Sequence, residues 1–187
     1  MNNHGVIIDN AIRRNPAEFA VLGALDGQDS HGYRLITFLQ DNLAGVCWLG
    51  RSQIYALLTK LEHEGLVKFE RMEQENFPAR KVYELTTQGR NVLNEWLLKP
   101  VSYMRDLRVE FLIKLFFARL KSTTVEQNLL KSQLDLCEAK LSRLIKIKSR
   151  TSSKIVEEAI DYRISMAQAS IFWLETLTRK QSARNSR

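Results

Sequence analysis

The sequence contains few residues that break helices in its second half and few that bind metals anywhere. No glycine follows Gly89 and no proline follows Pro100. Because these two residue types interrupt helices, their absence favours long helices toward the end of the chain. Cys47 and Cys137 stand alone, and the chain has 3 histidines and no CxxC pair. We therefore expect neither a structural metal site nor a cofactor.

Long apolar runs and catalytic signatures are absent too. No stretch reaches the roughly 18 apolar residues that a membrane-spanning helix needs. The N-terminal residues lack the basic region and long apolar run of a secretory signal, and two isolated cysteines fit a reducing compartment. We therefore expect a cytoplasmic protein with no membrane partner. A glycine-rich phosphate loop, a nucleophile elbow and an HExxH motif are all missing, which argues against an enzyme.

The net charge of +7 is distributed unevenly along the 187 residues. Residues 1–104 contain 11 basic and 12 acidic residues, whereas residues 105–187 contain 17 basic and 9 acidic residues. The basic excess therefore lies entirely in the second half, and net charge alone does not identify a nucleic-acid-binding part.

The first half does contain a predicted helix that is followed by a β-hairpin. The helix has an apolar face at helical spacing, formed by Ile54, Leu57, Leu58 and Leu61. Gly65 then ends the helix, and residues 66–71 and 81–85 are typical of two strands around a polar tip at 73–80. A helix with an adjoining hairpin can grip duplex DNA. The same pattern also occurs in α+β domains with no nucleic-acid role, and the pattern alone leaves both interpretations open.

Helices are predicted on both sides of this unit. Pro16 marks the start of the first helix, and an apolar pattern predicts a second over 31–43, in which Tyr33 faces the core. After the hairpin, a threonine cap begins another helix that ends before Pro100. Together these elements make a winged helix-turn-helix.

Three further helices are predicted near 105–120, 124–149 and 154–178. Apolar residues at alternating spacings of three and four mark a coiled-coil seam on the last two of them. Because an antiparallel helical hairpin cannot bury both stripes alone, we expect a homodimer; a self-contained three-helix bundle is the alternative. The predicted dimerisation residues are Leu130, Leu134, Leu141, Leu144, Tyr162, Met166 and Trp173.

The predicted fold is therefore mainly α with a small β-hairpin wing, and it divides into four parts. These are a flexible N-terminal arm (1–15), a winged helix-turn-helix domain (16–100), an antiparallel coiled-coil-like dimerisation domain (105–178) and a disordered basic tail (179–187). Near the turn of the predicted helical hairpin, the chain carries six cations, namely Lys140, Arg143, Lys146, Lys148, Arg150 and Lys154. They form either a solvated tip or a second DNA contact.

Several motifs, in this order, resemble the PadR family of bacterial transcriptional regulators. They are the helix at 19–25, the His31-Gly32-Tyr33 signature, the recognition-helix stretch at 53–67, the return strand at 80–86 and the Gly89-Arg90 helix start. The resemblance covers 16–120 and extends in architecture to residue 178. It is greatest for the longer subgroup with a helical C-terminal domain, the virulence and quorum-sensing regulators. That subgroup shares the departures of this chain from many members: Ala56 in place of proline, and a segment at 48–52 that is not rich in serine, proline and glycine.

The resemblance implies a dimeric DNA-binding regulator, more often a repressor than an activator, on a pseudo-palindromic operator. The exposed side of the helix and the wing supply groups that can meet phosphates or base edges. We expect DNA contacts from Arg51, Ser52, Gln53, Tyr55, Thr59, Lys60, Lys68, Arg80 and Lys81. A protein-interaction adaptor that uses the winged helix without reading DNA is the alternative function.

The resemblance also implies a regulatory ligand, because some members bind flat aromatic effectors between their domains. Aromatic side chains suit such ligands, and this predicts an effector site at Trp96, Phe111 and Leu115. The alternative is that these three side chains are plain core.

Overall fold

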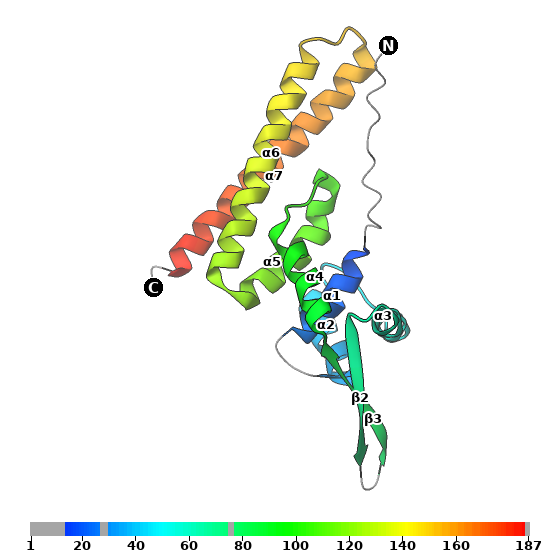
Figure 1. Ribbon diagram of the computed structural model, residues 1–187. Coiled ribbons are helices and arrows are strands. Elements are labelled where there is room, and N and C mark those ends of the chain that lie inside the picture. Colours follow the sequence, from blue (N-terminus) through cyan, green and yellow to red (C-terminus); the bar gives the residue numbers. More distant parts are fainter. Residues whose placement is uncertain (1–13, 27–29, 75–76, 186–187) are drawn as a thin grey trace.

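The structure, a computed structural model, describes residues 14–26, 30–74 and 77–185 (Figure 1). It is mainly helical with one small antiparallel sheet, which confirms the predicted fold class. In chain order the elements are α1 (Pro16–Leu25), β1 (Ser30–His31), α2 (Gly32–Leu43), α3 (Arg51–His63), β2 (Val67–Gln74), β3 (Phe77–Leu85), α4 (Thr87–Leu98), the 3-10 helix η1 (Met104–Arg108), α5 (Glu110–Lys121), α6 (Thr123–Lys148) and α7 (Lys154–Asn185). Among the described residues, no helix is long and apolar enough to cross a membrane.

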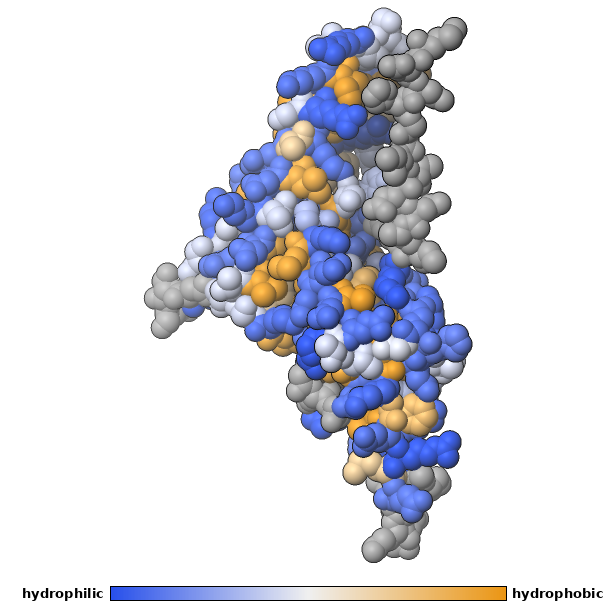
Figure 2. Space-filling model, viewed as in Figure 1, coloured by the Kyte–Doolittle hydropathy of each residue, from blue (hydrophilic) through white to orange (hydrophobic). Residues whose placement is uncertain are grey.

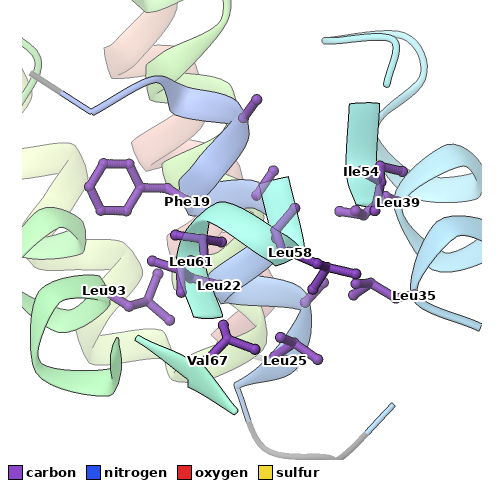
Figure 3. Packing of buried hydrophobic residues seen from close by; sticks show 14 of the residues in the cluster. Phe19, Leu22, Leu25, Leu35, Leu39, Ile54, Leu58, Leu61, Val67 and Leu93 are labelled. Carbon is purple, nitrogen blue, oxygen red and sulfur yellow. The ribbon is translucent and has the colours of Figure 1, made fainter. Parts of the chain in front are cut away.

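Helix α1 is the centre of the first half of the molecule. Its first turn is fixed by Pro16 and by the side chain of Asn15, which accepts a hydrogen bond from the backbone N–H of Ala17 at 3.0 Å. Every residue from 17 to 25 is buried. Figure 3 shows why: side chains of α2, α3, α4 and β2 converge on Phe19, Leu22 and Leu25.

The sheet has the strand order β1-β3-β2, and both pairings are antiparallel. Strands β2 and β3 form a hairpin that projects beyond the core (Figure 1). The predicted tip at 73–80 is wrong in extent, because β2 continues to Gln74 and β3 begins at Phe77. Ladder hydrogen bonds join backbones, so polar residues can extend a solvent-exposed hairpin. The two-residue strand β1 carries no sequence pattern and was not predicted.

The ends of α3 and α4 match their sequence signals. Gly65 follows α3 with a positive φ of 70°, a conformation that favours glycine after a helix. The Thr86 hydroxyl accepts a hydrogen bond from the backbone N–H of Gly89 at 3.0 Å and so caps α4. The predicted N-terminal arm, 1–15, lies outside the described residues except for its last two, and these belong to the folded domain.

The second half begins with a linker that is held in place from α6. The Gln133 side chain accepts from the backbone N–H of Val101 at 2.7 Å and donates to the carbonyl of Val101 at 3.2 Å. A second hydrophobic cluster surrounds Phe111 and Leu130. Helix α5 contributes side chains to both clusters, so it joins the two halves of the molecule.

Helices α6 and α7 form a long antiparallel arm that extends away from the wing (Figure 1). On α7 the residues Ile160, Ala167 and Leu174, spaced by seven, are buried. Two members of the predicted α7 stripe, Tyr162 and Met166, are 68% and 40% exposed, whereas the third, Trp173, packs against the second cluster. Figure 2 shows apolar patches among the hydrophilic surface of this arm.

The prediction of a disordered tail is wrong for most of that segment, because α7 continues to Asn185. The last turns are held by side chains: Gln181 is buried, and Arg184 Nη2 lies 2.8 Å from Glu126 Oε1. The side chain of Glu126 also lies 2.7 Å from Arg119 Nε. The partner of Arg184 lies far away in the sequence, so the basic, polar composition of this segment gave no sign of order.

A chain that ends after Thr178 should therefore be less stable than the full chain. We expect a loss of about 1 kcal/mol, since Glu126 keeps Arg119 but loses the partly exposed Arg184. Urea unfolding followed by circular dichroism would measure it, with a chain ending after Asn185 as the control. Equal stability of the two shortened chains would show that these turns contribute nothing.

Candidate nucleic-acid interface

Helix α3 has one buried and one exposed face. Ile54, Leu58 and Leu61 have no exposed surface, and they press the helix against α1 (Figure 3). The opposite side is exposed and lies beside the projecting hairpin (Figure 1). It presents the predicted contact residues Arg51, Ser52, Gln53 and Thr59 to solvent. The Thr59 hydroxyl donates to the carbonyl of Tyr55 at 3.1 Å, so it offers mainly its lone pairs to a ligand.

An open hollow of about 520 Å³ lies between the start of α2, the side of α3 and strand β3. We call it the wing hollow. Its lining residues are His31, Gly32, Tyr33, Tyr55, Arg80, Lys81 and Tyr83. None of these seven is acidic, and two are permanent cations. The structure thus brings together three predicted contact residues, from α3 and from the wing, around one space.

The shape of the wing hollow depends on Gly32. A Cβ atom at this position would lie 2.8 Å from the ring of Tyr55, so only glycine lets the ring pack over the start of α2. Beneath it, the Tyr83 side chain is buried, and burial raises the pKa of its hydroxyl above the ordinary value, with a further contribution from nearby Tyr55 and Glu62. Tyr83 therefore stays neutral in the floor of the wing hollow.

Two cations at the edge of this region rest on aromatic rings. The Arg51 guanidinium lies 6.0 Å from the ring centroid of Tyr33, and Lys81 Nζ lies 3.8 Å from that of Phe69. Such contacts orient a cation through the ring quadrupole. The prediction that Tyr33 faces the core is wrong, because its side chain is 68% exposed. Tyr33 is the second residue of α2, at the open end of the helix where the wing hollow begins.

Lys60 and Lys68 pair with carboxylates of the protein. Lys60 Nζ lies 2.8 Å from Glu18 Oε1, on the side of α3 that faces α1, and the Glu18 side chain is only 4% exposed. Lys68 stands directly opposite Glu84 in the hairpin register and forms an ion pair with it. The structure therefore gives both ammonium groups protein carboxylates as partners, whereas the sequence predicted DNA contacts for them.

The pKa of Glu18 reflects this arrangement. Burial alone would raise it, but hydrogen bonds from Lys60 and Arg14 outweigh burial and hold the pKa below the ordinary value of 4.5. Arg14 lies 3.0 Å from Glu18 and 2.5 Å from Glu64, so it ties α1 to the end of α3. These charges fix the position of the exposed helix.

The three residues of the predicted effector site are packed within two different clusters. The Trp96 ring stacks on Phe19 at a centroid distance of 4.2 Å and an interplanar angle of 3°, and Lys114 Nζ lies 4.3 Å from its centroid. Phe111 and Leu115 belong to the second cluster and are buried. All three side chains are thus packed within the protein, and the effector site at these residues stays a prediction.

Some of the predicted dimerisation residues are packed within the chain, and others are exposed. Leu130 is buried in the second cluster, the leucines that follow it on α6 are partly buried, and Trp173 packs edge-on against Phe111 at 5.8 Å. Tyr162 and Met166 remain exposed. A heptad stripe shows that a helix face is apolar, but not whether its own chain or another copy covers it.

The turn between α6 and α7 lies at the far end of the arm from the wing (Figure 1), and five of the six cations, at 143–154, lie around it, whereas Lys140 donates a hydrogen bond to the carbonyl of Ser102. Lys148 Nζ lies 2.6 Å from Asp161 Oδ1, and this hydrogen bond raises the pKa of Lys148. Their position favours the solvated tip over a second DNA contact.

Comparison with known proteins identifies the family of this chain. The model of the transcriptional regulator PadR-like family matches residues 21–95, and that of the virulence activator alpha C-terminal family matches residues 107–180. The chain is 33% identical over 128 residues to the negative transcriptional regulator PadR of Bacillus subtilis strain 168, which is 68% of this chain and 70% of that one. The chain belongs to the PadR-like family of transcriptional regulators.

Membership of the PadR-like family confirms the predicted regulator and the prediction that it is not an enzyme. Among solved structures, the chain is similar to Bacillus subtilis PadR in complex with operator DNA. The identity is 26% and the TM-score is 0.47, over 89% of this chain and 99% of that one. Bacillus subtilis PadR in complex with p-coumaric acid has 23% identity and a TM-score of 0.42, over 89% and 96% of the two chains.

Sequence reasoning named neither His31 nor Tyr33 for this region, although both line the wing hollow. His31 is the N-cap of α2, yet its side chain makes no capping hydrogen bond, and its Nδ1 atom is buried without a partner among the described residues. The available signal was the His31-Gly32-Tyr33 motif, whose glycine leaves room for the ring of Tyr55.

Replacing Lys60 with alanine should destabilise the protein, because Glu18 then keeps a buried carboxylate with one partner fewer. We expect a loss of about 1–2 kcal/mol at pH 7. Because the folded pKa of Glu18 is lowered, this stabilisation is present above pH 4.5 and is lost as the pH falls through the folded value.

Urea titrations of Lys60→Ala and the parent protein at several pH values would measure the difference. Lys131→Ala, at an exposed position of α6, is the control. If the difference in unfolding free energy between variant and parent grew as the pH is lowered, the assigned ion pair would be contradicted.

Proposed function

We propose that the protein is a sequence-specific, homodimeric DNA-binding repressor that acts in the cytoplasm on a pseudo-palindromic operator. The observation that carries this proposal is the exposed face of α3 beside a wing hollow with cations and no carboxylate in its lining. Phosphate oxygens are acceptors, and an interface of this kind offers them donors and positive charge. We assign residues 16–100 to DNA binding and the helices from η1 to α7 to dimerisation.

The direction of regulation is inferred from a relative. The Bacillus subtilis protein, 33% identical over 128 residues, is a negative transcriptional regulator. A dimer that covers a promoter region excludes other proteins from the same DNA, so repression needs no contact beyond DNA binding itself. We therefore propose repression for this chain.

Homodimerisation is supported by the apolar residues that α7 leaves exposed. Ile155, Tyr162 and Met166 lie on one stripe of the helix and are 72%, 68% and 40% exposed. A twofold axis beside α7 would pair each stripe with its copy, as isologous interfaces do. Two copies of α3 could then enter major grooves about 34 Å apart, one turn of duplex.

DNA binding is tested by a gel-shift titration of a duplex from the region upstream of the protein's own gene. We expect an affinity that falls steeply with salt, and Arg51→Ala should lower the slope of log affinity against log salt by about 1. Lys131→Ala on α6 is the control for the loss of one surface cation. An adaptor would bind no duplex in a salt-dependent way, whatever its sequence.

Dimerisation is tested by placing acids on the exposed stripe. The double variant Tyr162→Glu with Met166→Glu should elute at the mass of one chain in size-exclusion chromatography with light scattering, because four unpaired carboxylates would meet at a twofold interface. Gln168→Glu, at an exposed position elsewhere on α7, should leave the dimer intact. A double variant that remains dimeric would place the interface elsewhere.

A further inference from the structure

We propose that the wing hollow is a pocket for one phosphodiester group of the DNA backbone, and that this contact sets how α3 sits in the groove. The inference rests on the proposed function, because it takes duplex DNA as the ligand. It adds the ligand group and a set of residues that act on it together: Tyr55 from α3, Arg80 from β3, and His31 at the start of α2.

The chemistry of the lining selects a phosphate over a base edge. Arg80 and Lys81 supply positive charge, and the hydroxyls of Tyr33 and Tyr55 supply neutral donors. Adenine and cytosine edges present an amino donor in the major groove, guanine presents two acceptors there, and a phosphodiester presents only acceptors together with a negative charge. With no acidic lining residue, the wing hollow offers no strong acceptor to a base amino group and suits a ligand that only accepts.

Two polar groups at the start of α2 lack partners that a phosphate would supply. No side chain caps the first turn of this 12-residue helix, and the N–H groups of a helix start carry partial positive charge. The buried Nδ1 atom of His31 has no hydrogen-bond partner among the described residues. Buried polar atoms in folded proteins are usually satisfied, and a rotation of the His31 ring that turns Nδ1–H into the wing hollow would let a phosphate oxygen accept from it.

The dimensions agree with this ligand. At about 520 Å³ the wing hollow exceeds a lone phosphate and can also take the adjoining sugar. The ring of Tyr55 forms one wall because Gly32 lets it lie over the backbone. A phosphodiester in this place would bridge the recognition helix and the wing, so the two could not move independently on the duplex.

A double-mutant cycle tests whether Tyr55 and Arg80 act on the same phosphate. The probe is a random-sequence duplex at low salt, because phosphate contacts do not depend on base sequence. Tyr55→Phe removes a hydroxyl, and we expect about fivefold weaker binding with an unchanged salt slope. Arg80→Ala should weaken binding about tenfold or more and lower the salt slope by about 1.

If both residues hold one phosphate, the double variant should bind clearly better than the product of the two single effects predicts. Tyr103→Phe and Arg150→Ala, both exposed outside the wing hollow, are matched controls that should bind like the parent protein. Circular dichroism melts would show that each variant is folded.

Strictly additive effects, or no effect of Tyr55→Phe, would overturn the pocket while leaving DNA binding intact. Loss of salt-dependent binding by the parent protein itself would instead overturn the proposed function, and the pocket with it. The two failures are thus distinguishable in one set of titrations.

Discussion

The whole structure depends on the complete burial of α1. Because every residue of this helix from 17 to 25 is buried, it must be covered on all sides, and α2, α3, α4 and α5 supply the cover. The apolar face of α3 is used up in this contact, so its polar face has to point outward. One acidic residue, Glu18, is enclosed with the apolar ones, and its charge then requires Arg14 and Lys60 beside it. Burial of α1 thus decides which face of α3 points outward and which lysine pairs with Glu18.

The same helix also connects the DNA-facing elements to the arm. A Cβ atom on Gly23 would lie 2.7 Å from the ring of Phe117, so α1 and α5 approach as closely as glycine allows. Nearby, the buried Lys114 donates to the carbonyls of Trp96 at 2.5 Å and Lys99 at 2.8 Å, and so caps the end of α4 from α5. These contacts leave little freedom for one half of a protomer to move against the other. In a dimer, the orientation of the arms would therefore set the spacing of the two copies of α3.

Local patterns in the sequence predicted local structure well and tertiary partners poorly. The helical spacing of Ile54, Leu58 and Leu61 predicted α3 and its buried face because all three residues belong to one element. The pairing of Lys60 with Glu18 joins residues 42 positions apart, and the pairing of Arg184 with Glu126 joins residues 58 positions apart. No periodicity reports such contacts, so Lys60 was assigned to DNA and the end of α7 to a disordered tail. The wing hollow was half predicted for the same reason: Arg80, Lys81 and Tyr55 were expected from the hairpin and α3, whereas His31 and Tyr33 at the start of α2 were not.

Four cations of the first half differ in the partners that they have. Lys60 and Lys68 meet carboxylates, which cancel their charge, whereas Arg51 and Lys81 rest on the rings of Tyr33 and Phe69. An aromatic ring orients a cation but carries no net charge, so the full positive charge remains available to a ligand. This explains how residues 1–104, with 11 basic and 12 acidic residues, can present a positive surface. Glu18 and Glu84 are matched by Lys60 and Lys68, none of which lines the wing hollow, whereas Lys81, which rests on a ring, does line it. A domain of this kind needs no basic excess to bind a polyanion, only a separation of its ion pairs from its ring-supported cations.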